Sequence, residues 1–297
     1  MTAPGLALRP ARPSHLKRDL ALVGAAALVV VCAIAVDVDP AEILELPAGL
    51  ALVFYEMFLE SGPDWSYLPT AIDGMIESLQ IAWVGTVIGA IISLPLGFFG
   101  AKNVSSGLVS NVIRQLLNAI RAFPEIVLAI AIMIPIAGLG PVAGALAIGV
   151  HSVGTLGKLT AEVIEGIDPG PVEAARATGG RTLQIQRWGV LPQVLPEIIA
   201  FWLYRFEINI RAAAVLGVVG AGGIGFSLQQ TITFHRYPLA GTAIIVVVVA
   251  TIAVDTLSGW TRRRIIEGSG ARRVGAEAIE EPSFAGSGAA RIDTDFG

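Results

Sequence analysis

Long stretches without a charged side chain constrain the fold of this chain more than any other feature. Residues 20–36, 78–99 and 126–157 contain no Asp, Glu, Lys or Arg. A helix needs about 20 apolar residues to cross the hydrocarbon core of a bilayer, so the first two stretches are each predicted to cross it once. The third is too long for one crossing and has turn residues at 135–141 (PIAGLGP), which predicts a helical hairpin. Six crossings are completed by two further, largely apolar stretches, 198–219 and 239–254.

The composition favours an all-α polytopic membrane protein. Of 297 residues, 54% are hydrophobic and 15% are charged, which is more apolar material than a soluble domain of this length needs for its core. A net charge of −4 gives no indication of nucleic-acid binding. The single cysteine, Cys32, excludes an internal disulfide and a Cys-based metal site, and three scattered histidines do not predict a metal site either.

Lys and Arg side chains indicate which side of the membrane each connection faces, because cytoplasmic loops retain positive charge. Residues 1–19 hold four of them, whereas residues 37–70 hold none and carry seven acidic side chains. The other positive charges that mark cytoplasmic connections are Lys102, Arg114, Arg121, Arg176, Arg181, Arg187, Arg262, Arg263 and Arg264. Six crossings satisfy all of these charges, so both termini are predicted to be cytoplasmic and residues 37–70 extracytoplasmic.

Two segments outside the crossings have their own patterns. Within the extracytoplasmic residues 37–70, apolar side chains recur at roughly helical spacing among acids from 42 to 60, which predicts an amphipathic helix at the outer interface. Residues 266–297 are rich in Gly, Ala, Ser and charge. They are therefore predicted to form a disordered cytoplasmic tail.

The first crossing has an alternative interpretation. Positive charges, an apolar run and Ala33-Ile34-Ala35 imitate a secretory signal with its cleavage site. Cleavage would leave five crossings that start outside, which the charge pattern also permits. Because the run 20–36 is longer than the roughly 7–15 apolar residues of a signal core, we favour a retained cytoplasmic N-terminus, 1–19, and a first membrane helix, 20–36.

Residues 168–192, between the fourth and fifth crossings, are predicted to form two short helices separated by a glycine break. Asp168 can cap the first helix, Gly179 follows its C-terminus, Thr182 can cap the second helix and Pro192 stops it. The motif residues are Glu173, Ala174, Ala175, Gly179, Leu191 and Pro192. Their spacing resembles the cytoplasmic EAA loop through which permease subunits of ABC importers contact their ATPase. Gly189 departs from that pattern, which usually has Ile there.

Further motifs extend the resemblance over roughly residues 70–265. They are RAFPE at 121–125, GLGPVAG at 138–144, GKL at 157–159, LYRFE at 203–207 and GAGGIG at 220–225. Together they resemble the permease subunit of phosphonate ABC importers. The resemblance implies the methionine-importer-like permease fold over residues 71–265, a homodimer, two ABC ATPase subunits, an extracytoplasmic substrate-binding protein and the cytoplasmic membrane of a bacterium. It also implies phosphonates or related phosphorus oxyanions, phosphate and phosphite, as substrates.

No nucleotide site is predicted in this chain. Gly157-Lys158 lacks the earlier glycine and the following Ser or Thr of a Walker A motif. ATP and Mg²⁺ are therefore expected to be used by partner subunits, while this chain binds no cofactor and is no enzyme. One coupling loop in each chain agrees with a two-fold dimer on an ATPase pair.

The glycine-rich residues 220–225 match the dinucleotide fingerprint G-x-G-x-x-G, but the context of a cofactor site is missing. They follow a membrane helix rather than a strand, and no acidic residue stands about 20 positions further on. A flexible turn that serves close helix packing, a gate, or both is expected instead. Its glycines are Gly220, Gly222, Gly223 and Gly225.

Charged side chains inside the fifth crossing are candidates for a translocation path, because charges within a membrane usually face a partner or a watery cavity. The candidates are Arg205, Glu207, Asn209 and Arg211, with His151 of the fourth crossing. Glu207 and Arg211 stand four residues apart and are expected to pair. The cluster then retains one positive charge, which suits an anionic substrate.

Two roles remain open for these arginines. In the first, Arg205 or Arg211 lines the path and binds the anion through charge-assisted hydrogen bonds. In the second, they form an interhelical salt-bridge network that only fixes packing, with Glu125 or Glu162 as the acceptor.

The expected mechanism is alternating access driven by ATP-dependent closure of the partner ATPases. The alternatives are an ABC permease for another small solute such as methionine, a secondary transporter that works without an ATPase, and a membrane-embedded enzyme. The sequence offers no intramembrane nucleophile with a base and no paired His and carboxylate, which disfavours the enzyme. Membrane lipid is the remaining expected partner.

Overall fold

The structure, a computed structural model, describes residues 16–35 and 40–280, and every regular element within these ranges is a helix. The all-α prediction is therefore confirmed. The chain divides into two compact units, Met1–Glu60 and Ser61–Gly297, and each is described by itself. The first residues of the predicted N-terminal segment and the last residues of the predicted tail lie outside the described residues.

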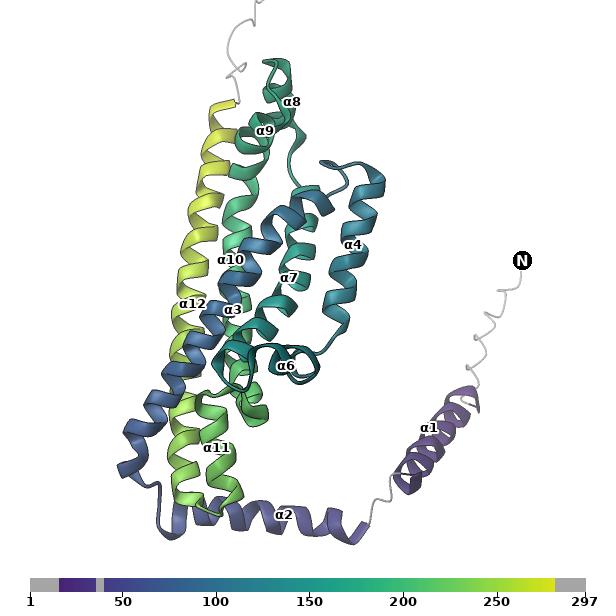
Figure 1. Ribbon diagram of the computed structural model, residues 1–297. Coiled ribbons are helices and arrows are strands. Elements are labelled where there is room, and N and C mark those ends of the chain that lie inside the picture. Colours follow the sequence, from purple (N-terminus) through teal and green to yellow (C-terminus); the bar gives the residue numbers. More distant parts are fainter. Residues whose placement is uncertain (1–15, 36–39, 281–297) are drawn as a thin grey trace, which may run out of the picture. The chain divides into compact units, whose positions relative to one another are not determined.

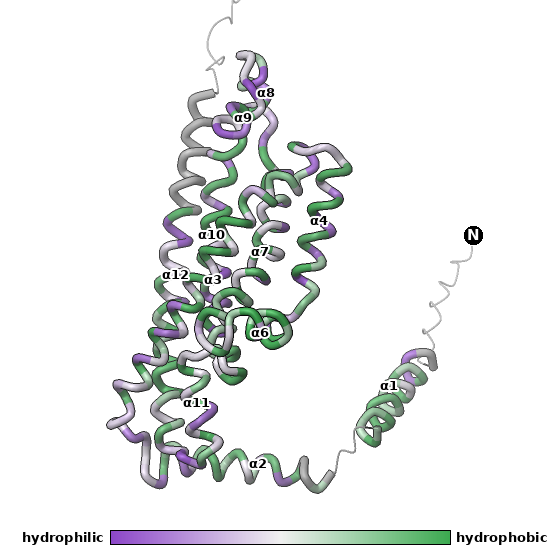
Figure 2. Tube along the Cα trace, viewed as in Figure 1, coloured by the Kyte–Doolittle hydropathy of each residue, from purple (hydrophilic) through white to green (hydrophobic). Residues whose placement is uncertain are grey.

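The first unit consists of two helices. Helix α1 (Leu16–Ala35) is long and apolar enough to cross a membrane, and its large side chains are exposed, with Leu20 at 72%. Figure 2 shows it as hydrophobic over most of its length. Helix α2 (Pro40–Tyr55) continues into the π-helical turn η1 (Glu56–Glu60). A helix was expected in this region.

The second unit is a bundle in which α3, α7 and α10 form the centre (Figure 1). Helix α3 (Leu68–Gly100) starts after the 3₁₀ turn η2 (Trp65–Tyr67), where Asp64 accepts a hydrogen bond from the Ser66 amide at 2.9 Å. Helix α7 (Pro141–Glu165) runs parallel to α3, and α10 (Leu191–Leu216) runs antiparallel to both. These directions agree with the alternation that the charge pattern requires.

Small side chains hold α3 and α7 close together. A Cβ added to Gly85 would lie 2.7 Å from Ile148 Cγ2, and one added to Gly89 would lie 2.5 Å from Ser152 Cβ. Glycines that face a neighbouring helix let the two backbones approach and gain van der Waals contact, which is how membrane helices associate. The α3–α7 pair is therefore the most closely packed part of the bundle.

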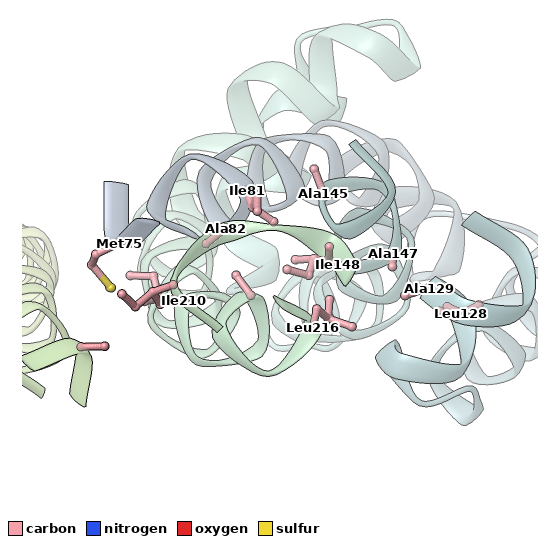
Figure 3. Close-up of a cluster of buried hydrophobic side chains, with 14 of the residues drawn as sticks. Met75, Ile81, Ala82, Leu128, Ala129, Ala145, Ala147, Ile148, Ile210 and Leu216 are labelled. Atoms are coloured by element: carbon pink, nitrogen blue, oxygen red, sulfur yellow. The ribbon is translucent and has the colours of Figure 1, made fainter. Parts of the chain in front are cut away.

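The buried side chains form two clusters. The larger lies between α3, α7 and α10, where Ile81, Ile148 and Leu216 are at most 2% exposed (Figure 3). The smaller one lies toward the loop-bearing end of the bundle and includes Ile164 and Val194. Outside these clusters many large apolar side chains of the helices are exposed, as expected of surfaces that lipid or a second subunit covers.

The third predicted crossing differs from the expectation. Helix α4 (Gly107–Ala122) packs along α7, and the chain then bends by 88° into the short helices α5 (Glu125–Leu128), η3 (Ala129–Met133) and α6 (Ile134–Ala137). The crossing therefore starts at Gly107 rather than near residue 126. Hydropathy missed α4 because its interior contains polar residues. The predicted turn before α7 is confirmed, since Gly138 and Gly140 have φ of 80° and 134°.

The rest of the bundle follows the coupling segment α8 (Pro169–Ala177), α9 (Thr182–Ile185) and η4 (Gln186–Val190). Helix α10 leads through the kink η5 (Gly217–Ala221) to α11 (Gly223–Thr233), bent by 58°. In Figure 1, α8 and α9 lie at one end of the bundle and α11 at the other.

The last helix, α12 (Tyr237–Glu280), is longer than the predicted sixth crossing 239–254. It therefore enters the segment 266–297, for which the sequence predicts disorder. Within the described ranges, four single helices are long and apolar enough to cross a membrane, and six spans result when each of the two bent helix pairs counts as one. On that count the number of predicted crossings agrees with the structure.

Candidate functional site

The predicted coupling segment has the helix–break–helix form. Asp168 caps α8, its Oδ1 accepting a hydrogen bond from the Gly170 amide at 2.9 Å, and Gly179 ends the turn with φ of 75°. The predicted cap of the second helix is wrong by one residue. Arg181 is the N-cap of α9, and the Gln184 side chain accepts a hydrogen bond from its amide at 2.8 Å. The Gln184 side chain, rather than a threonine hydroxyl, therefore accepts the hydrogen bond at the start of this helix.

The surface of the coupling segment combines charged and apolar side chains. Glu173 and Ala174 are exposed, and Ala175 is partly buried. Leu183 and Trp188 are 84% and 70% exposed. A large exposed apolar side chain beside charges is a common feature of protein–protein contact surfaces.

Gly189, the departure from the family pattern, has a structural reason. A Cβ at this position would lie 3.2 Å from both Pro171 O and Val172 Cα. The glycine thus lets η4 lie directly against the start of α8. A bulkier residue would separate the two short helices.

Gln193 ties the coupling segment to α10, and the sequence alone did not single it out. Its side-chain nitrogen donates hydrogen bonds to Asp168 O at 3.2 Å and to Gly189 O at 2.6 Å, and its oxygen accepts one from the Asp168 amide at 3.2 Å. Movement of α8 is therefore linked directly to the first turn of the membrane helix α10.

Glu165 joins three helices at the same end of the bundle. Its Oε1 accepts hydrogen bonds from the Lys102 amide at 2.7 Å and from Arg114 Nη2 at 2.6 Å. Arg114 also donates from Nε to Gly100 O at 2.9 Å. The ends of α3 and α7 and the middle of α4 are thereby held together at the base of the coupling segment.

A buried polar cluster lies in the middle of the bundle, around Arg205 of α10. Its guanidinium donates to Glu125 Oε1 at 2.6 Å and to Ser152 Oγ at 3.1 Å. His151 Nδ1 lies 2.7 Å from both Arg205 Nη2 and Glu125 Oε1, so the expectation that no histidine is paired with a carboxylate is wrong. The side chain of Arg205 is only 7% exposed. Glu125 is thus the acceptor expected if the arginines form a salt-bridge network that only fixes packing.

Asn209 extends this cluster one turn further along α10. Its side-chain nitrogen donates to Thr86 Oγ1 at 2.8 Å and to Ser152 Oγ at 3.1 Å, and its side chain is fully buried. Polar groups buried in a membrane protein need such partners. Three helices, α3, α7 and α10, are therefore linked by polar contacts as well as by close packing.

The predicted pairing of Glu207 with Arg211 is wrong. Arg211 Nη1 lies 3.2 Å from Asp255 Oδ2, and the nearest cation to Glu207 is Arg262 at 3.9 Å. Both counter-charges come from α12, which packs along α10 and presents them on the side where the two α10 side chains emerge. Arg211 is accessible, with its side chain 53% exposed, whereas Glu207 is 8% exposed.

Several buried polar atoms at the α10–α12 contact have no hydrogen-bond partner within the described residues. They are Glu207 Oε1, Asp255 Oδ1 and Ser258 Oγ. The other proposed acceptor, Glu162, lies 3.8 Å from Lys158 on its own helix and contacts no arginine of α10. The α10–α12 contact is thus more polar and less completely paired than the Arg205 cluster.

The glycine-rich turn is attached to α3. Glu77 Oε2 accepts a hydrogen bond from the Gly223 amide at 2.9 Å, and Ser78 Oγ accepts one from the Ile224 amide at 3.0 Å. Gly220 and Gly222 have φ of 93° and 80°, which side chains rarely adopt. A Cβ on Gly225 would overlap the carbonyl oxygen of Ala214. Close packing therefore requires these glycines, and the preceding helix excludes a dinucleotide fold here.

Comparison with known sequences gives a consistent relationship. The model of the family described as "Binding-protein-dependent transport system inner membrane component" matches residues 93–267. The phosphite transport system permease protein PtxC of Stutzerimonas stutzeri is 41% identical over 68% of this chain and 73% of that protein. The putative phosphite transport system permease protein HtxC of the same organism is 34% identical over 90% and 95%. The phosphate-import permease protein PhnE of Mycolicibacterium smegmatis is 39% identical over 64% of this chain and 36% of that protein.

Solved structures show the same fold. A chain from an inward-facing structure of the MetNI methionine ABC transporter matches with a TM-score of 0.58 at 21% identity, over 65% of this chain and 95% of that chain. A chain of an amino acid ABC transporter crystallised with histidines matches with a TM-score of 0.57 at 23% identity, over 67% and 95%. The predicted methionine-importer-like permease fold is therefore confirmed.

Proposed function

Because this chain belongs to the family of inner membrane components of binding-protein-dependent transport systems, we propose that it moves phosphonates or related phosphorus oxyanions, including phosphate and phosphite, into a bacterial cell as the permease of an ABC importer. The chain is a multi-pass permease and not an enzyme. The observation that carries the proposal is the coupling segment, a helix pair with exposed Glu173, Leu183 and Trp188, at the end of a bundle of this fold. The substrate class is supported by relatives named for phosphite and phosphate transport.

The complete transporter contains two copies of this chain, two ABC ATPase subunits and an extracytoplasmic binding protein. ATP and Mg²⁺ act in the ATPase subunits. The coupling residues Glu173, Ala174, Ala175 and Gly179, with Leu191 and Pro192 at the start of α10, form the surface that fits an ATPase groove. Support comes from the exposure of that surface and from Gln193, which connects it to α10. Both termini face the cytoplasm in this arrangement, in keeping with the distribution of Lys and Arg.

The candidate residues in the fifth crossing have different parts in this path. Arg205, Asn209 and His151 hold the wall in place, since their side chains contact one another or a shared partner, Ser152. Arg211 faces the path and attracts the anion, and Glu207 lies behind it against α12. The exposure of the Arg211 side chain, 53%, supports this division. A half-exposed arginine can exchange Asp255 for a phosphorus oxyanion by the same charge-assisted hydrogen bonds. The glycines from Gly220 to Gly225 act as a gate at the far end of α10.

The proposed substrate class is tested by titrating the partner binding protein with a phosphonate, phosphate and phosphite, and then by measuring uptake into proteoliposomes that contain the whole complex. We expect uptake of at least one of these anions, dependent on ATP and on the ATPase subunits. Uptake that persists without the ATPase subunits would identify a secondary transporter instead. Uptake of methionine but of no phosphorus oxyanion would refute the substrate assignment.

The role of Arg211 is tested separately by Arg211→Lys and Arg211→Gln. We expect the lysine variant to keep part of the uptake rate and the glutamine variant to lose most of it, because only lysine retains the charge. Normal uptake and normal substrate-stimulated ATP hydrolysis in both variants would exclude a role in the path.

A further inference from the structure

Helix α4 carries a row of polar side chains that has no partner. Asn111, Gln115 and Asn118 recur at i, i+4 and i+7 on one face, and Arg121 lies beside them. We call these four residues the polar stripe. All four are exposed. Within the described part of the chain, none of their side chains makes a hydrogen bond or an ion pair.

The other faces of α4 are accounted for. Leu117 is 1% exposed and packs against α7, where a Cβ on Gly157 would lie 2.7 Å from Leu117 Cδ2. A separate face presents the exposed apolar side chains Val112 and Leu116, at 59% and 47%. The helix therefore has one face for α7, one for an apolar environment and a third, the polar stripe, that suits neither.

The position of the polar stripe along the bundle follows from the contacts of α4 with α7. Arg114 meets Glu165 at the end of α7 that carries the coupling segment. About two turns further along α4, the Arg121 amide nitrogen would lie 3.0 Å from a Cβ added to Gly154, in the middle of α7. Helix α4 thus runs beside α7 from the coupling end to mid-bundle (Figure 1). Arg121 is therefore inside the bundle's span, not in a surface loop as the charge pattern had predicted.

Such a row of side chains is unfavourable against lipid. An arginine at the centre of a bilayer costs about 2.5–3.5 kcal/mol on the scale derived from insertion, so charged side chains there usually face the bundle interior or a water-filled cavity. Arg205 of α10 is already hydrogen-bonded to Glu125 and Ser152, so its guanidinium is not available to an anion. Arg121 is left with a free guanidinium group at mid-bundle.

We propose that the polar stripe lines the cytoplasmic half of the translocation path and that Arg121 binds the phosphorus oxyanion there on its way to the cytoplasm. This inference rests on the proposed function and assigns the path a second cation besides Arg211. The guanidinium of Arg121 donates to two oxygens of the anion, and the side-chain amides of Asn118 and Gln115 donate to it next. The exposed apolar face of α4, with Val112, faces lipid.

The water-filled environment of the polar stripe can be measured without transport. In a Cys32→Ser background, Gln115→Cys and Asn118→Cys are each exposed to a membrane-impermeant methanethiosulfonate in inside-out vesicles that contain the complex, and Val112→Cys is the matched control on the same helix. We expect labelling about ten-fold faster at 115 and 118 than at 112, because the reactive thiolate forms in water and not in hydrocarbon. Equal, slow labelling at all three positions would overturn the proposal and indicate that a second copy of the chain covers the stripe.

The role of Arg121 is tested by uptake of inorganic phosphite into proteoliposomes that contain the complex and its loaded binding protein. We expect Arg121→Gln to lower the uptake rate at least about ten-fold, the effect of losing one charge-assisted hydrogen bond, while Arg121→Lys retains more of it and Val112→Ala is unchanged. Unchanged uptake by Arg121→Gln would overturn the proposal. If the unaltered complex carries no phosphorus oxyanion, the proposed function fails, whereas the labelling result still shows whether the polar stripe faces water.

Discussion

The buried cluster around Arg205 allows a quantitative test of whether it fixes packing or handles substrate. The Arg205 and Glu125 side chains are 7% and 19% exposed and lie 2.6 Å apart. Removing one partner of a buried ion pair costs about 3–5 kcal/mol, because the other charge stays buried without a partner. We therefore expect Arg205→Met to lower the free energy of unfolding by about 3 kcal/mol, the lower end of that range, because His151 still contacts the Glu125 carboxylate.

A second substitution should reverse most of this loss. In Arg205→Met/Glu125→Gln no buried charge remains unpaired, so the double variant should lie within about 1–2 kcal/mol of the unaltered protein. Glu125→Gln alone should also cost about 3 kcal/mol, because Arg205 then stays buried without its counter-charge, so the coupling energy in the double-mutant cycle is about 4–5 kcal/mol. The measurement is reversible unfolding of the purified chain in mixed micelles by increasing denaturant, with all four proteins compared under one set of conditions.

Two results would refute this reasoning. The first is additivity of the two single substitutions within about 0.5 kcal/mol, since the residues would then not interact. The second is a stable double variant that has lost uptake while ATP hydrolysis still responds to the loaded binding protein. That result would show that Arg205 contacts the anion itself.

Three further predictions concern the contacts that join the helices. Gln193→Ala should lower the ratio of uptake to ATP hydrolysis, because it removes the three hydrogen bonds between α8, η4 and α10. Glu197→Ala, at an exposed site one turn later, should leave that ratio unchanged. Equal ratios in the two variants would contradict this prediction. Gly225→Ala should lower the yield of folded protein and its stability by about 2 kcal/mol or more, since the new methyl group meets backbone. Gly259→Ala, with open space around the site, should be neutral or slightly stabilising, and equal effects at the two glycines would contradict the packing seen at Gly225. Glu165→Gln should cost about 1–2 kcal/mol in unfolding experiments, because Arg114 loses its counter-charge. No loss would show that the hydrogen bonds from the Lys102 amide to residue 165 and from Asn103 Nδ2 to Ile164 O hold the helix ends without this ion pair.

The first half of the coupling segment, α8 and the glycine break, could be predicted because its determinants are local, whereas the predicted stop at Pro192 is wrong, since η4 continues into α10 at Leu191. The Asp168 cap and the break at Gly179 depend on side chains within a few residues of the backbone groups they serve. The same locality applies to the turn at Gly138 and Gly140. The connection through Gln193 was missed, because its partner Asp168 lies 25 residues away in the sequence.

The charged residues of α10 illustrate the limit of helical spacing as evidence. Spacing of four residues put Glu207 and Arg211 on one face, and a pair was inferred. Their counter-charges, Arg262 and Asp255, are on α12, and the Arg211 partner is 44 residues further along the chain. A neighbouring helix that offers an opposite charge competes with a pair within one helix, which is worth only about 0.2–0.5 kcal/mol. The choice between them depends on helix packing, which the sequence pattern does not contain.

Helix α4 was missed as part of a crossing for a related reason. Hydropathy averages over all faces of a helix, and α4 divides its surface among three environments. Leu117 packs on α7, Val112 faces an apolar environment, and Asn118 lies on a face that neither of these covers. A helix that borders a polar path inside a membrane must carry such a mixture, so its average falls below the level of a lipid-enclosed span. In this fold, the segment that hydropathy rejects is therefore where a polar path is to be sought.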